Sequence, residues 1–176
     1  MDFYVTWVKS NPLLSAFIQF AVLGTIGEII SLSLKNKKLT IGGTIPQLAA
    51  KIFAWGILGV FIKYGFVAMK GTVKALIFHQ LFPGFFEKGF FWAFAVSVVT
   101  NVFFGPQMMY FHRLEENVIH RKCDFSGLDF ALKTLIWFWI PAHTVTFMLP
   151  SEFQIGLAAL WSIALGIILG LALPQK

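Results

Sequence analysis

The stretch Pro12–Leu34, PLLSAFIQFAVLGTIGEIISLSL, decides the fold of this chain. It is apolar apart from a few hydroxyl and amide side chains and one carboxylate, Glu28. About 20 residues of helix cover the ~30 Å hydrocarbon core of a bilayer, so this stretch is long enough to span a membrane. Because the core offers no water to a carboxylate, Glu28 must face other protein, a wet cavity or a cation.

The small and polar residues of this helix recur every three or four positions and therefore share one face. They are Ala21, Gly24, Thr25, Glu28 and Ser31. The bulky apolar residues between them are left for lipid or for apolar packing. We therefore expect a polar seam inside the protein and lipid outside it, repeated in the other spans.

The composition excludes a soluble domain. Hydrophobic residues make up 57% of the 176 residues and charged residues only 12%, with a mean hydropathy of +0.76. The net charge of +6 does not indicate nucleic-acid binding, because Lys and Arg stand at the ends of apolar runs, where they anchor helices at headgroups. The only cysteine, Cys123, excludes an internal disulfide, and with His120 it provides too few ligands for zinc. We expect no metal and no cofactor.

Apolar runs predict spans at about 12–34, 44–69, 90–112, 128–150 and 153–173, in a single membrane domain covering residues 1–176. The segment 70–88 mixes lysines with phenylalanines and predicts a short interfacial helix and a turn. The polar segment 113–127 predicts a loop outside the membrane. No cleavable signal pattern is visible, so the first run is expected to remain as a span. The predicted fold is an all-α integral membrane protein, a bundle of four to five transmembrane helices plus a short interfacial helix.

Small residues at helical spacing predict the faces through which the spans pack closely. These residues are Gly24, Gly56, Gly59, Ala158, Ser162, Gly166 and Gly170. The face in the last span would serve within one chain or between two copies in a homo-oligomer, and both alternatives stay open. Pro106 and Pro141 each remove a backbone hydrogen bond, which predicts kinks that expose carbonyl groups to the interior.

A buried ion pair follows from position alone. Glu28 lies about six residues before the end of the first predicted span, and Lys51 about six residues after the start of the second. The short loop makes these spans antiparallel neighbours, with both charges roughly 9 Å inside the same interface. Pairing would avoid an unpaired charge, which costs on the order of 2–3 kcal/mol at that depth. In the alternative, Lys51 reaches the headgroups and Glu28 meets a backbone group or a hydroxyl.

Other polar residues inside the predicted spans are candidates for a polar interior or a pore, which needs donors, acceptors and charges facing water. They are Lys63, Thr100, Asn101, His143 and Thr144. No nucleophile, base or metal cluster is visible, and the four histidines do not form close pairs on one span. We therefore expect that the protein is not an enzyme.

Three segments near the C-terminus stand in a recognisable order: Trp139-Ile140-Pro141-Ala142, Phe147-Met148-Leu149-Pro150 and Trp161. They resemble the "WPA…NF..VP…W" signature of the peroxisomal membrane protein and mitochondrial inner-membrane (Mpv-seventeen-type) family. Upstream, the run from Thr100 to Pro106 is similar to that family's "DQ…AP" stretch, and Leu114-Glu115 to its "LLEG".

The N-terminal part carries the same resemblance. Asn11-Pro12 and the run from Gly24 to Glu28 are similar to the family's "hP..T…G.l..GD" opening, with Glu in place of Asp. Lys63-Tyr64-Gly65-Phe66 departs from the family, which has "GP..H.WY..L" there, and Gln154 stands where an Arg is usual. The likeness is collinear over nearly the whole chain and implies a distant relative, for which the excess of Lys over Arg favours a bacterial source.

The resemblance implies a channel or transporter for small hydrophilic metabolites, integral to a bacterial cytoplasmic membrane or, in a eukaryote, to the mitochondrial inner or peroxisomal membrane. Its partners would be membrane lipid and a small solute, not nucleic acid. One alternative is the solute-binding membrane subunit of a multi-subunit uptake transporter. Another is a structural or assembly membrane protein with no solute path, whose interior would pack without a cavity.

Overall fold

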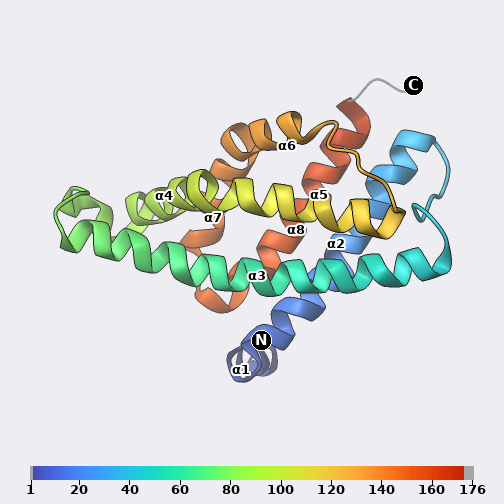
Figure 1. The fold of residues 1–176 in the computed structure, drawn as a ribbon. Helices are drawn as coiled ribbons and strands as arrows, with labels where there is room; N and C mark the ends of the chain where they lie inside the picture. The colour runs from blue at the N-terminus through green and yellow to red at the C-terminus, as the bar shows by residue number, and fades with distance from the viewer. Residues whose placement is uncertain (1, 173–176) are drawn as a thin grey trace.

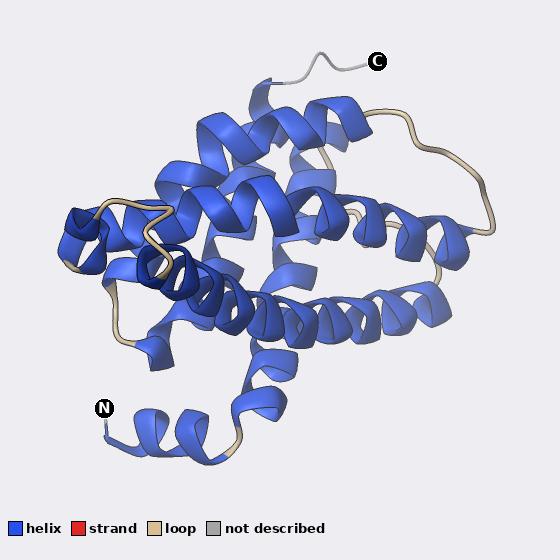
Figure 2. Cartoon of the chain, turned by 60° about the vertical axis from the view of Figure 1, so that its left-hand side comes forward, coloured by secondary structure: helices blue, strands red, loops and turns tan. Residues whose placement is uncertain are grey.

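The computed structural model describes the backbone of residues 2–172 and the side chains of residues 2–168 (Figure 1). Residues 2–172 are helical with short connections and contain no strand (Figure 2). Four helices of this part are long and apolar enough to cross a membrane: α2 (Pro12–Asn36), α3 (Ile45–Phe78), the helical stretch Gly89–His120 and α8 (Ser151–Ala172). The all-α membrane bundle is therefore confirmed, and the chain is a polytopic membrane protein.

A short helix, α1 (Asp2–Ser10), precedes the first span and projects from the bundle (Figure 1). Pro12 begins α2, since the first helical position needs no backbone donor. The Tyr4 hydroxyl donates to Gln19 Oε1 at 3.0 Å, and Lys9 Nζ lies 3.0 Å from Glu152 Oε1. These contacts hold α1 against the beginnings of α2 and α8.

The second span is longer than the sequence predicts. α3 does not end near residue 69 but continues without a break to Phe78, over 34 residues. The segment 70–88 is therefore not an interfacial helix of its own: its first nine residues belong to α3, and only the 3-10 turn η1 (Gly84–Glu87) follows. The physical reason is that lysine is a good helix former, and no proline occurs between Pro46, in the first turn of α3, and Pro83. At ~1.5 Å per residue, α3 is about 51 Å long, well beyond a bilayer core.

The third span also continues further than predicted. α4 (Gly89–Val99), the π-helical segment η2 (Thr100–Phe104) and α5 (Gly105–His120) follow one another without a loop. Residues 113–120 of the predicted polar loop thus belong to α5, and the loop is confined to 121–127. Charges spaced for helix pairing explain the difference: Arg113 Nη1 lies 3.2 Å from Glu116 Oε2, and Arg121 ends the helix in a left-handed conformation.

Both predicted kink prolines follow a π-helical turn. α6 (Leu128–Thr134), the π-helical η3 (Leu135–Trp139) and α7 (Ile140–Met148) make up the fourth predicted span. Pro106 and Pro141 are each the second residue after such a segment, and the N–H of the residue before them donates to a carbonyl five residues back. The wider turn accommodates the missing proline N–H, so the helices are distorted but not broken. η2 and η3 contact each other.

The glycines of α2 and α3 allow these helices to approach closely. A Cβ on Gly24 would lie 2.5 Å from Trp55 Cε3, and one on Gly59 would lie 2.5 Å from the Ala16 carbonyl oxygen. Gly56 lies against the Phe17 ring in the same way. The predicted packing face of α3 is therefore confirmed, and its partner is α2.

The small-residue face of α8 packs against the other side of α2. A Cβ on Gly166 would lie 2.9 Å from the Gly27 carbonyl oxygen, and Ala158 is fully buried. Gly170, predicted on this face, lies outside the residues whose side-chain surroundings are described. Because α2 covers Gly166 within the same chain, that residue is engaged inside the bundle, not between copies.

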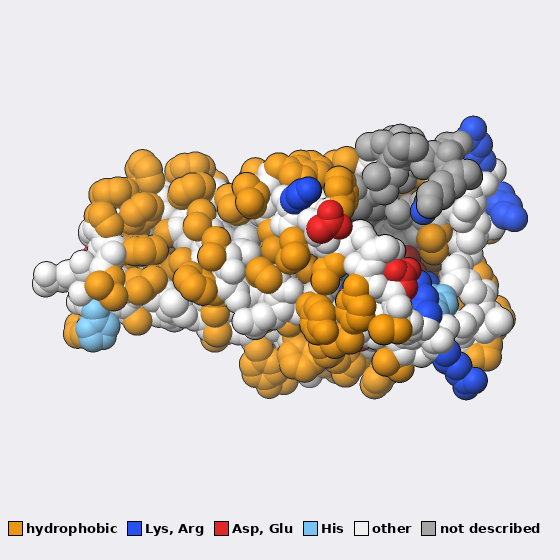
Figure 3. All heavy atoms as spheres, turned by 45° about the horizontal axis from the view of Figure 1, so that its top comes forward, with side chains coloured by type: hydrophobic (Ala, Val, Ile, Leu, Met, Phe, Trp, Pro, Cys, Tyr) orange, Lys and Arg blue, Asp and Glu red, His pale blue; other side chains and the backbone are white. Residues whose placement is uncertain are grey.

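Apolar side chains cover most of the visible surface, and most of the Lys and Arg seen there gather at one end (Figure 3). Many of these apolar residues are large, such as Phe53, Phe61 and Phe103, each exposed on the outside of its helix. A soluble protein does not expose a contiguous apolar surface of this extent. The outer surface of the bundle is therefore suited to lipid.

The two glycines Gly59 and Gly71 of α3 provide a matched test of this packing. Gly59→Ala should destabilise the protein by about 1–3 kcal/mol, since its methyl group would meet the Ala16 backbone. Gly71→Ala should be neutral or stabilise by up to about 1 kcal/mol, since its methyl group would meet nothing within 4 Å. Unfolding in mixed micelles measures both, and equal effects of the two substitutions would contradict the packing of α2 on α3.

Candidate functional site

A cavity of about 300 Å³ lies inside the bundle, lined from α2, α3, α5, α7, α8 and the two π-helical segments. Its walls are mostly apolar and include several aromatic rings and two methionines. These are Phe20, Trp55, Phe66, Phe104, Trp139, Met108 and Met109. Two groups of polar side chains adjoin this apolar space, one around Glu28 and one around Asn101. A concave, mainly apolar space with a few polar groups is typical of a small-molecule site.

Glu28 and Lys51 form the ion pair that their positions predict. The Lys51 side chain is 5% exposed and that of Glu28 is 15% exposed, so both charges are largely removed from solvent. The second carboxylate oxygen, Glu28 Oε2, accepts a hydrogen bond of 3.0 Å from Trp55 Nε1. The alternative in which Lys51 reaches the headgroups is therefore wrong. The α2–α3 hairpin supplies all three residues.

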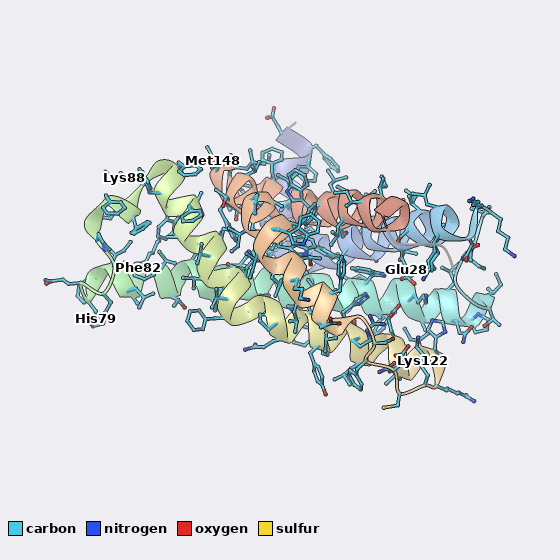
Figure 4. The ribbon with its side chains drawn as sticks, turned by 90° about the horizontal axis from the view of Figure 1, so that it is seen from above. Glu28, His79, Phe82, Lys88, Lys122 and Met148 are labelled. Atoms are coloured by element: carbon cyan, nitrogen blue, oxygen red, sulfur yellow. The ribbon has the colours of Figure 1, made fainter. Side chains whose placement is uncertain are left out.

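The network extends from Trp55 to α5. The rings of Trp55 and His112 have centroids 4.5 Å apart, and both residues line the cavity. His112 Nδ1 is 3.7 Å from Glu115 Oε2, which is too long for a hydrogen bond. Figure 4 places Glu28 toward the end of the bundle that carries Lys122, opposite the end with His79 and Lys88. This polar group thus belongs to the basic end of the protein.

The second polar group forms where the π-helical segments meet. The Ile140 carbonyl accepts hydroxyl hydrogen bonds from Ser97 Oγ and Thr144 Oγ1, each 2.7 Å long. Asn101 Nδ2 donates to the Ser97 carbonyl at 2.8 Å and lies 3.1 Å from His143 Nδ1. Since the amide nitrogen is a donor, His143 Nδ1 must accept, which assigns the proton of a neutral ring to Nε2.

Four polar atoms on residues that line the cavity have no hydrogen-bond partner among the residues described. They are Thr100 Oγ1, Asn101 Oδ1, His112 Nδ1 and Trp139 Nε1. Thr100 is 1% exposed and Asn101 is 3% exposed, so bulk water does not satisfy them. Leaving such a group unpaired costs about 1–3 kcal/mol. Asn101 Oδ1 is an acceptor and Trp139 Nε1 is a donor, whereas the Thr100 hydroxyl and the His112 ring nitrogen can each serve in either role.

The structure brings together four of the seven predicted interior residues. Glu28, Thr100, Asn101 and His143 line the cavity. Lys51 does not line the cavity but pairs with Glu28, which does. The Thr144 hydroxyl donates a hydrogen bond to the Ile140 carbonyl. Lys63 is only partly buried and does not line the cavity.

Sequence reasoning did not identify the aromatic and polar residues Trp55, His112 and Trp139 as cavity residues. Trp55 could have been found from the sequence, because it lies one turn after Lys51 on the same face of α3. The sequence predicts His112 at the end of the third span, whereas α5 continues to His120. Among residues 2–168, no three His, Cys, Asp or Glu side chains are grouped so that they could hold a metal ion.

Comparison of this chain with known protein families, with curated proteins and with solved structures gives no match. The resemblance to the Mpv-seventeen-type family therefore stays a prediction. The case for a function rests on the geometry of the cavity.

The Glu28–Lys51 pair gives a second test. Glu28→Gln leaves the buried Lys51 ammonium without its counter-charge and should destabilise the protein by about 3 kcal/mol, as should Lys51→Met for the carboxylate. The double variant Glu28→Gln/Lys51→Met should lose much less than the sum of the two, because neither charge is then left alone. Denaturation of all four proteins in mixed micelles yields the coupling energy, and strictly additive losses would mean that the two charges do not stabilise each other.

Proposed function

We propose that this protein carries a small solute across the membrane by binding it in the central cavity. The observation that carries the proposal is the set of four unpaired polar atoms, on Thr100, Asn101, His112 and Trp139, among the residues that line one apolar cavity inside a membrane bundle. Such groups are costly to bury unless a bound molecule or water satisfies them. Ligand sites between the helices of a bundle are built in this way.

The lining supports a neutral, partly apolar solute. Glu28 is the only acidic residue at the cavity, and Lys51 neutralises it, so the site presents little net charge. The aromatic and methionine walls suit an apolar body, while Asn101 Oδ1 and Trp139 Nε1 suit one donor and one acceptor on the solute. This refines the expected class of small hydrophilic metabolites, because an open pore for those would need a polar lining along its length.

The cavity also helps to distinguish between the alternative functions. A purely structural or assembly protein was expected to pack without a space between its spans, so about 300 Å³ of cavity favours a ligand-binding role over that class. A solute-binding subunit of a larger transporter would have the same cavity. The proposed transporter and such a subunit differ in whether this chain alone moves the solute.

Transport by proteoliposomes containing the purified protein tests the proposal. N-acetyl amino acid amides of graded side-chain size serve as neutral, partly apolar solutes, and lactate serves as a charged one. The protein should give saturable uptake of at least one amide above that of empty liposomes. Met108→Trp, which narrows the cavity, should reduce that uptake by at least about tenfold, since the bound solute and the indole ring compete for the same space.

Met148→Trp is the matched control, because Met148 is exposed on the outside of the bundle and should leave uptake unchanged. Saturable binding by equilibrium dialysis without uptake would favour the subunit that needs a partner. If neither binding nor uptake of any amide depends on Met108, the cavity is not a solute site of the proposed class.

A further inference from the structure

A second concave region lies at the other end of the molecule, where α3 ends and α4 begins. This groove has a volume of about 620 Å³ and is lined by Lys70, Lys74, Lys88 and Glu87 on its polar side. Three ammonium groups face one carboxylate, so the groove carries an excess of positive charge. It is separate from the central cavity, with which it shares no lining residue.

The three lysines have no acidic partner in the part of the chain that the structure describes, since the ion pairs found there involve other residues. Lys70 is partly buried and held in place: its Nζ donates to Gln154 Oε1 at 2.7 Å and lies 5.9 Å from the centre of the Phe147 ring. Both contacts are with neutral groups. The ammonium is therefore positioned, and its charge is left for an anion.

The other side of the groove is apolar and is formed by Ile77, Phe78 and Trp92. Phe82 and Lys88 lie together with His79 at this end of the bundle (Figure 4). α3 is longer than the helix that a bilayer core needs, and we expect its last turns, with the groove, at the level of the headgroups. Aromatic rings and lysines at that level are typical of the membrane interface.

We propose that this groove binds the phosphate headgroup of an anionic phospholipid. The ammonium groups of Lys70, Lys74 and Lys88 donate charge-assisted hydrogen bonds to the phosphate oxygens. The lipid chains descend along Phe78 and Trp92 into the bilayer, a combination that a free phosphate ion would not use. This proposal is independent of the proposed function, because it concerns a different region of the protein.

The lipids that the purified protein retains show directly whether the groove binds an anionic headgroup. The protein is reconstituted in nanodiscs of phosphatidylcholine and phosphatidylglycerol in equal amounts, released into mild detergent, and its bound lipids are counted by native mass spectrometry. The native chain should retain phosphatidylglycerol in preference to phosphatidylcholine. Lys74→Gln/Lys88→Gln should lower that preference by about fivefold per lysine. Both lysines are exposed, so this variant should fold normally.

Lys35→Gln/Lys38→Gln is the matched control, since it removes the same charge from exposed residues at the end of α2. The proposal is overturned if the native chain shows no preference, or if both double variants lose it equally, which would indicate a general charge effect. Inorganic phosphate supplies the second arm. If millimolar phosphate alone displaces the retained phosphatidylglycerol, the site takes a free anion and not a lipid.

Discussion

Backbone-to-backbone contact of α2 with two other helices is the constraint on which this structure depends. Lipid surrounds the bundle, so burial from water cannot drive one helix onto another, and close packing must supply the attraction. Glycine provides it on both sides: Gly59 of α3 meets the Ala16 carbonyl, and Gly166 of α8 meets the Gly27 carbonyl. On α2 held in this way, the Glu28 carboxylate is largely buried and meets Lys51 and Trp55.

The cavity lies where these three helices meet α5, α7 and the two π-helical segments. α4 and α7 pack against each other on one side, while η2 and η3 meet where their backbones are widened. Next to Pro141, the Ile140 carbonyl accepts hydrogen bonds from the side-chain hydroxyls of Ser97 and Thr144. The same junction contains Thr100 and Asn101, which line the cavity and whose Oγ1 and Oδ1 atoms have no hydrogen-bond partner among the residues described. The distorted backbone of η2 and η3 therefore supplies part of the lining of the candidate site.

Much of this could be predicted from local pattern. The length of the Pro12–Leu34 run, the spacing of Gly56 and Gly59, and the position of Glu28 relative to Lys51 each depend on a few neighbouring residues and one short loop. The ends of α3 and α5 could not be predicted, because lysine and glutamate are compatible with both a helix and a polar loop. The cavity could not be predicted either, since it requires knowing how residues of five helices meet, and no spacing within one helix reports that.

The π-helical segment η2 determines which side of α5 faces the cavity. A π turn contains one more residue than an α turn, and one residue corresponds to about 100° of rotation around a helix axis. Without that extra residue, Met108, Met109 and His112 would turn away from the cavity that they now line. An insertion or deletion of one residue near Thr100 would thus change the chemistry of the interior without changing any side chain in it. The number of residues in this one backbone turn therefore determines which side chains of α5 line the site.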